Sequence, residues 1–534
     1  MEEKYIENKS FRATSRRKRS LLNTILSFSG EIILVVIGML VPRAIMVNYG
    51  STTNGLVTSL QQIISYFTLF EAGIYGTALF SLYKPMSEHN IQKINKILAS
   101  ANRFFIKIGF LFIAMLIILG IIYPLVASDS GFSNIEVFFL ILVVGLNIVF
   151  QEFAGSKYKV ALMASQKNWQ VSAIRTTSIS LYYIIIVVLS YLKFHPIAVY
   201  GIAGIAFVFR SLLFYIVCKK QFPGIYFHSF KNEFKFKQTF DVLSQQILSL
   251  IVLNSPVLIM AFAKTDLNIV SVYTTYNLVL SGIYLIVNSL NNSLLTSFGN
   301  LVAEKKEKVI SIYREFEIVF QMLWSVIVPC LAILLLPFIE AYTSGIQDVE
   351  YSNIYITIIC VCTAAFWIIR CQQTIILSAK GDFKSMRYGA IMEASLVVVF
   401  SVVGYIIGFL ISPDASKYLW GLIGLLFGRM LGIFARAIEI VIVNNKKQNM
   451  NSFLFSIWQI FLSILTSIIG YSVCYWIFSN YIIFSNLWLN LVFEGFLSLL
   501  INILIVCLIR FFIDKKNFLS VIEKAKFFKK RKKL

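Results

Sequence analysis

The sequence predicts an all-α polytopic membrane protein of about fourteen transmembrane helices, arranged as two six-helix lobes followed by two C-terminal helices. Three observations lead to this fold class. Of the 534 residues, 58% are hydrophobic and 14% are charged, whereas soluble domains carry about a quarter charged residues. The apolar residues form runs of about 20 or more, which is the length that crosses a bilayer. Basic residues gather in alternate connections between those runs.

The apolar runs place the helices in order along the chain. The first six precede a basic connection and cover residues 21–45, 56–82, 104–126, 136–161, 171–192 and 197–218. Six more cover residues 241–263, 268–300, 316–338, 354–379, 389–411 and 418–443. The last two cover residues 453–478 and 486–512. The first run is longer than a signal-peptide core and lacks a cleavage site, so we expect it to stay in the membrane.

These runs predict the organisation of the whole chain. The expected parts are a basic N-terminal segment (1–20), an N-lobe (21–218), an inter-lobe connection (219–240), a C-lobe (241–443), a helix pair (453–512) and a basic tail (513–534).

The distribution of Lys and Arg predicts which side each connection faces. Positive charge is retained on the cytoplasmic side. It is concentrated in residues 84–103, 157–167, 219–237, 305–308, 380–387 and 446–447, while the intervening connections are nearly bare. An even number of spans puts both basic termini on this same side. We therefore expect a multi-pass membrane protein with cytoplasmic termini. The tail either contacts anionic lipid heads or only fixes the topology.

Composition and motifs exclude several function classes. The excess of 48 basic over 26 acidic residues follows the topology of a membrane protein, so it does not imply a nucleic-acid partner. The chain lacks zinc-ligand spacing, a Walker motif and a GxSxG motif. We therefore expect no metal, no cofactor and no enzymatic activity. The short outer connections leave little room for an external active site, which makes a membrane sugar polymerase or ligase the weaker alternative.

A faint internal repeat suggests two related halves. Residues 201–207 (GIAGIAF) precede Arg210, and residues 421–427 (GLIGLLF) precede Arg429. Residues 161–169 and 375–383 also follow the fourth and tenth runs with similar polar patterns. Paired halves of this kind are how many transporters build alternating access.

Charged residues inside the apolar runs are the most informative feature for function, because each one is costly in a bilayer and therefore faces a cavity or a partner. They are Glu31, Arg43, Glu71, Arg175, Arg210, Arg370, Glu393, Arg429, Arg436, Glu439 and Glu494. Arginine predominates over lysine within the runs, and guanidinium binds phosphate through two parallel hydrogen bonds. We therefore expect an anionic substrate bound by Arg210, Arg370 and Arg429. The alternative is that the charges near helix ends extend to the membrane surface or pair locally, as Arg436 and Glu439 would at i, i+3.

Two acidic residues and one proline suggest how transport is driven. Glu31 and Glu71 lie at equal depth, about 16 Å from the cytoplasmic ends of consecutive helices, and could form a carboxylate pair that binds H⁺ or Na⁺. Pro256 lies in the middle of the seventh run, where it predicts a bend used in switching.

Three local patterns identify a family resemblance. Residues 48–56 (NYGSTTNGL), 65–74 (SYFTLFEAGI) and 82–85 (LYKP) resemble the start of polysaccharide transporters in the multidrug/oligosaccharidyl-lipid/polysaccharide (MOP) exporter superfamily. The resemblance is to O-antigen or capsule flippases and extends to the number of spans, the two lobes and the basic inner loops.

The resemblance implies a V-shaped pair of lobes that carries undecaprenyl-pyrophosphate-linked oligosaccharide from the inner to the outer leaflet. It matches Glu71 to the family's acidic position on the second span and Arg43 to the basic end of the first, which adds Arg43 to the substrate-binding candidates. Arg210, Arg370 and Arg429 match the family's cationic cavity in kind. The implied partners are the lipid-linked oligosaccharide, membrane lipid, a coupling ion, and the polysaccharide polymerase and other assembly proteins.

Two alternatives share the fold. A flippase for the peptidoglycan lipid precursor has the same pyrophosphate requirement. A small-molecule exporter would have a cavity dominated by acidic and aromatic groups, which the arginine excess disfavours.

Overall fold

The computed structural model describes residues 16–88, 90–126, 131–153, 155–165, 167–224, 239–304, 309–380, 382–448, 453–480, 484 and 486–519. Within these ranges some side chains, including that of Glu71, are also outside the description. The expected N-terminal segment, inter-lobe connection and basic tail fall largely outside the described residues.

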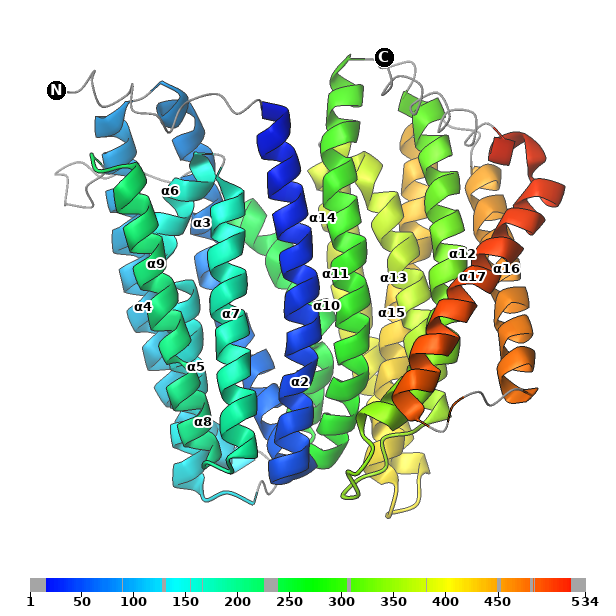
Figure 1. Cartoon of the computed structure of the whole chain (residues 1–534), viewed down its shortest axis with the longest axis horizontal. Helices are drawn as coiled ribbons and strands as arrows, with labels where there is room; N and C mark the ends of the chain where they lie inside the picture. Colours follow the sequence, from blue (N-terminus) through cyan, green and yellow to red (C-terminus); the bar gives the residue numbers. More distant parts are fainter. Residues whose placement is uncertain are drawn as a thin grey trace. The chain divides into compact units, whose positions relative to one another are not determined.

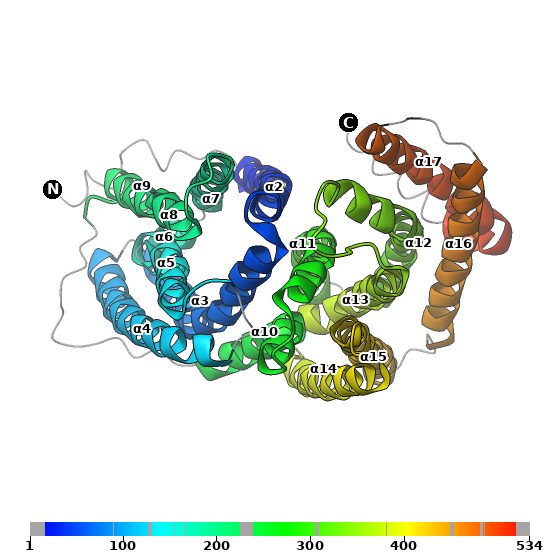
Figure 2. The same ribbon diagram turned by 90° about the horizontal axis from the view of Figure 1, so that it is seen from below.

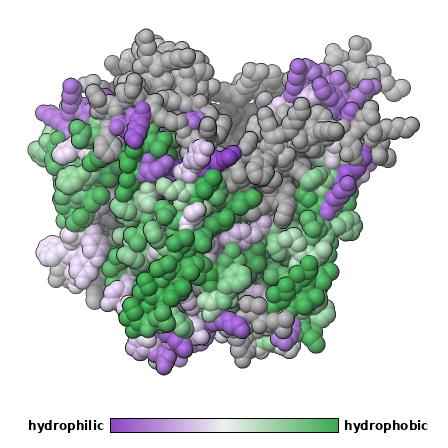
Figure 3. Space-filling view, turned by 180° about the vertical axis from the view of Figure 1, so that it is seen from behind, coloured by the Kyte–Doolittle hydropathy of each residue, from purple (hydrophilic) through white to green (hydrophobic). Residues whose placement is uncertain are grey.

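Every regular element in the described part of the chain is helical, and each predicted apolar run lies in helical structure. Eleven helices there are long and apolar enough to cross a membrane. The remaining predicted runs fall in the helices at Leu69–Ser87, Thr239–Phe262 and Lys417–Gln448. Hydrophobic side chains cover the middle of the helices and hydrophilic ones lie toward their ends (Figure 3). The chain is thus a multi-pass membrane protein of the expected fold class.

The chain divides into two compact units, Met1–Ser271 and Val272–Leu534. Unit 1 holds α2 (Arg16–Ser65), η2 (Tyr66–Thr68), α3 (Leu69–Ser87), α4 (Ile91–Val126), α5 (Asn134–Glu152), α6 (Ser156–Ala164), α7 (Asn168–Tyr191), α8 (Pro196–Ala203), α9 (Ile205–Gln221) and α10 (Thr239–Phe262). Neighbouring helices form a ring in the order α2, α7, α8 and α9, α5, α4, α3 and α10. The short α6 packs against α3, α4, α7 and α9 (Figures 1 and 2).

Local sequence explains where these helices bend and begin. The helical segment α2 changes direction at Gly50, whose φ of 86° lies in the left-handed region that glycine adopts without strain. This bend separates the first two predicted runs. Helix α5 begins with a capping box, in which Ser133 Oγ accepts from the Glu136 amide and the Glu136 carboxylate accepts from the Ser133 amide.

Helix α10 packs against α2 and α3, so the structure groups it with unit 1, whereas the sequence assigns residues 241–263 to the C-lobe. The exact lobe boundaries stay a prediction.

Unit 2 holds most of α11 (Leu267–Glu304), together with α12 (Val309–Tyr342), α13 (Ile354–Lys380), α14 (Phe383–Ile411), α15 (Lys417–Gln448), α16 (Phe453–Asn480) and α17 (Leu487–Ile513). Helices α14 and α15 approach so closely that a Cβ atom on Gly424 would collide with the carbonyl oxygen of Gly404. Small residues at such a crossing let two membrane helices pack backbone against backbone.

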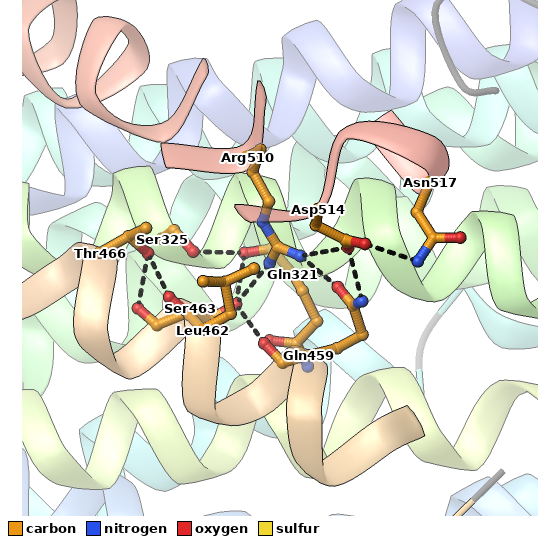
Figure 4. A network of polar contacts seen from close by, with 9 residues as sticks. All are labelled: Gln321, Ser325, Gln459, Leu462, Ser463, Thr466, Arg510, Asp514 and Asn517. Atoms are coloured by element: carbon orange, nitrogen blue, oxygen red, sulfur yellow. Dashed lines mark hydrogen bonds and ion pairs between the residues drawn. The ribbon is translucent and has the colours of Figure 1, made fainter. Parts of the chain in front are cut away.

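A buried polar network attaches α17 to α12 and α16 (Figure 4). The fully buried Arg510 donates hydrogen bonds to Gln459 Oε1 and, at 3.0 Å, to Ser463 Oγ. It also forms an ion pair with Asp514 at 3.6 Å, and Asp514 accepts a hydrogen bond from Gln459 Nε2 at 2.9 Å. Ser463 in turn donates to the carbonyl of Gln321 on α12. The buried charge of Arg510 is therefore balanced by Asp514 and by hydrogen bonds to polar side chains of α16.

A single amide links α5 to the junction of α8 and α9, where Asn147 Nδ2 donates to the carbonyl of Tyr200 at 2.8 Å in a buried environment. Asn147→Ala is expected to lower the stability of unit 1 by about 0.5–1.5 kcal/mol, because it removes one buried hydrogen bond while the Tyr200 carbonyl still accepts from the Gly204 amide. The melting temperature of the purified protein in detergent measures this. An unchanged melting temperature would show that the bond contributes nothing.

Candidate functional site

Two helix interruptions in unit 1 meet at one cavity. The first separates α2 from α3 at the 3₁₀ turn Tyr66–Thr68, and the second separates α5 from α6 after Glu152. The cavity has a volume of about 440 Å³, and its lining residues are Ser65, Thr68, Tyr75, Ile148, Gln151, Glu152 and Lys159. Irregular backbone at membrane depth is tolerated where it is buried in protein or lines a water-filled cavity, and broken helices often mark transport sites. We call this cavity the unit 1 pocket.

The unit 1 pocket contains an ion pair of its own. Lys159 Nζ lies 3.5 Å from Glu152 Oε2, and the two side chains are 20% and 22% exposed. Gln151 Nε2 donates to the other carboxylate oxygen of Glu152 at 2.8 Å. Lys159 Nζ also lies over the ring of Tyr75, 4.6 Å from its centroid. The polar groups are thus held in place by one another, which prepares them for a ligand.

Arg210 on α9 extends this cluster. Its side chain is buried, its guanidinium lies over the Phe214 ring at 5.6 Å from the centroid, and it interacts electrostatically with Glu152. Arg210, one of the predicted substrate-binding residues, thus acts on the Glu152 carboxylate but is not among the residues that line the pocket.

Helix α10 reaches the rim of the same pocket. Asn254 Nδ2 donates to Ser65 Oγ at 2.9 Å. Pro256, the predicted hinge, is buried two residues further along this helix. If the helix bends at Pro256, Asn254 would move relative to Ser65, and the hydrogen bond between them would be the contact that changes.

Unit 2 contains a buried ion cluster, which we define as Arg370, Glu393, Arg436 and Glu439. Glu393 is 1% exposed and lies 3.0 Å from Arg370 Nε and 3.8 Å from Arg436 Nε. Arg436 also pairs with Glu439 on its own helix. The Arg370 guanidinium lies over the ring of Trp367, 4.3 Å from its centroid. One carboxylate thus joins α13, α14 and α15.

Arg429 has a different environment. It is 1% exposed and donates a hydrogen bond to Tyr273 Oη at 3.2 Å. Within the described ranges no carboxylate forms an ion pair with it. Glu393 acts on Arg429 electrostatically from beyond ion-pair distance, and the role of Arg429 in substrate binding stays a prediction.

Solved structures show which fold this is. The lipid II flippase MurJ, in an inward closed conformation, is similar with a TM-score of 0.67 and 16% identity over 93% of this chain and 99% of that chain. An inward-facing multidrug resistance MATE family transporter of the MOP superfamily is similar with a TM-score of 0.60 and 12% identity over 83% of this chain and 99% of that chain. A mutant of the Vibrio cholerae MATE transporter VcmN is similar with a TM-score of 0.52 and 17% identity over 82% of this chain and 98% of that chain. The chain has the fold of MOP-superfamily transporters.

No family model and no curated protein matches the sequence. At these identities the structures show the MOP fold alone.

The structure places the predicted coupling residues in unlike settings. Glu31 forms an ion pair with Arg175 on α7. Glu71 is in α3, but its side chain lies outside the described residues, so the predicted pair of carboxylates stays a prediction. Arg43 is partly buried in α2 and has an interaction partner. The predicted binding of the substrate by Arg43, Arg210, Arg370 and Arg429 likewise stays a prediction.

Sequence reasoning missed three groups inside the MOP fold. Glu152 lies inside the predicted run 136–161 and Lys159 in the basic connection 157–167, yet both line the unit 1 pocket. The polar pattern QE at 151–152, followed by lysines at 157 and 159, was the available signal. Glu317, fully buried in α12, accepts a hydrogen bond from Gln373 Nε2 at 2.9 Å. The sequence analysis did not single out Glu317.

Proposed function

We propose that this protein is a flippase that carries undecaprenyl-pyrophosphate-linked oligosaccharide repeat units across the bacterial plasma membrane by alternating access. The products would serve capsule, O-antigen or exopolysaccharide assembly. The observation that carries the proposal is the similarity to MurJ over nearly the full length of both chains. A lipid-linked substrate needs a polar path only for its head group, because the polyprenyl tail stays in lipid.

The extent of the structural similarity favours a lipid-linked substrate over a small molecule. The MurJ similarity covers 93% of this chain and the two MATE similarities cover 83% and 82%. The difference is about the length of α16 and α17 together. The buried arginines favour the same choice, since guanidinium suits a pyrophosphate rather than an organic cation.

A second candidate, transport of the peptidoglycan lipid precursor, is favoured by the same MurJ similarity. Gene deletion distinguishes the two. The proposal predicts that lipid-linked oligosaccharide accumulates inside the cell and surface glycan disappears. Intact surface glycan with failing cell-wall synthesis would instead support the second candidate.

Arg429→Gln is expected to abolish export and preserve folding. The guanidinium is proposed to attract the pyrophosphate, and its removal leaves no paired carboxylate behind among the described residues. Surface polysaccharide in complemented cells measures export, and the yield of monodisperse protein measures folding. Tyr273→Phe is the control, because it removes the hydrogen bond and keeps the positive charge. Normal surface polysaccharide with Arg429→Gln would contradict the role of this arginine.

Arg210→Gln and Arg370→Gln are each expected to abolish export as well. Arg370→Gln also alters the buried ion cluster, so its folding must be measured before its transport is interpreted.

A further inference from the structure

We propose that the unit 1 pocket binds a glycosyl group of the transported oligosaccharide through Gln151, Glu152 and Lys159. This inference rests on the proposed function and adds a specific saccharide site within one unit. Three properties of the pocket carry it: its size, its mixture of donors and acceptors, and the contacts that fix those groups before a ligand arrives.

The size of the pocket suits an organic ligand. Its volume of about 440 Å³ falls in the range of roughly 300 to 1,000 Å³ that small-molecule sites occupy. A bound proton or a single cation would not need this space. The walls come from two separate helix interruptions, so the cavity is built by the fold and is not a gap beside one side chain.

The mixture of polar groups matches sugar hydroxyls. Each hydroxyl both donates and accepts, and neighbouring hydroxyls point in different directions. The pocket offers carboxylate acceptors at Glu152, ammonium donors at Lys159 and an amide with both functions at Gln151. Tyr75 and Ile148 add apolar surface for the C–H face of a sugar ring.

Other substrate groups fit less well. A pyrophosphate needs several cationic donors, yet the lining contains one lysine and also a carboxylate that repels an anion. A lipophilic cation would meet the ammonium of Lys159. A neutral or weakly charged saccharide avoids both conflicts.

The polar groups are held before a ligand enters. Lys159 is placed by Glu152 at 3.5 Å and by the Tyr75 ring at 4.6 Å, and Gln151 orients the carboxylate at 2.8 Å. Groups fixed in this way lose little conformational entropy when a ligand binds.

Binding to the purified full-length protein tests the proposal. The probes are the free oligosaccharide released by mild acid from the cell's own lipid-linked repeat unit, the intact lipid-linked form, and inorganic pyrophosphate. Gln151→Leu and Glu152→Gln are expected to weaken binding of the free oligosaccharide at least about tenfold, and to leave pyrophosphate binding unchanged. Glu439→Gln is the matched control, since this carboxylate is 25% exposed and paired with one arginine in unit 2.

The outcomes separate this inference from the proposed function. If wild-type protein transports the lipid-linked form, yet both variants bind the free oligosaccharide as tightly as wild type, the pocket is not a saccharide site. If wild-type protein neither binds nor transports the lipid-linked form, the proposed function itself fails. Gln151→Leu breaks no ion pair, so it keeps the test valid if Glu152→Gln does not fold.

Discussion

Glu393→Gln is expected to destabilise unit 2 by about 3–5 kcal/mol, because it leaves two buried guanidinium groups without their shared carboxylate. Arg370 and Arg436 are 15% and 3% exposed, so water replaces little of what they lose. The melting temperature and the folded yield in detergent should both fall sharply.

Two comparisons show whether the shared carboxylate is the cause. Glu439→Gln removes a partner of Arg436 that is 25% exposed, so it should have a much smaller effect. The double variant with Arg370→Gln should regain part of the lost stability, because it also removes one of the stranded cations. If the double variant is no more stable than Glu393→Gln alone, the ion cluster does not explain the loss.

Arg510→Met is expected to detach the C-terminal helix from its neighbours, with a cost again of about 3–5 kcal/mol. Methionine resembles the aliphatic part of arginine, yet the substitution removes the ion pair of the buried Asp514, which keeps only amide donors, and two hydrogen bonds to α16 (Figure 4). Amide hydrogen exchange should rise in α16 and α17 and stay unchanged in unit 1.

Lys515→Met is the control for that experiment, since Lys515 is exposed and contacts only the ring of Phe511 among the interactions described for it. Equal exchange in α17 for Arg510→Met and wild type would contradict the role of the network.

The fold was predictable from sequence because bilayer thickness sets a length that apolar runs must match. Helix boundaries follow local chemistry. Between the first two predicted runs, for example, the chain bends at Gly50, whose backbone is in the left-handed region. The arginine-rich interior was also predictable, since the cost of burying charge makes each such residue conspicuous.

The partners of those arginines were not predictable, because they depend on how each helix is rotated about its axis. Arg370 pairs with Glu393, whereas Arg429 meets Tyr273, and no spacing in the sequence distinguishes them. Glu152 and Lys159 escaped notice for a related reason. Next to a helix interruption, charged residues look like loop residues in a hydropathy pattern, even when the interruption lies inside the protein.

Transport by the purified full-length protein in liposomes tests the proposed flippase activity most directly. Undecaprenyl-pyrophosphate-linked oligosaccharide is placed in the inner leaflet, and its appearance outside is followed by an added enzyme that cleaves the sugar. We predict faster appearance than in protein-free liposomes, with the gain lost in Arg429→Gln. Appearance at the protein-free rate, under every ion gradient applied, would contradict the flippase proposal.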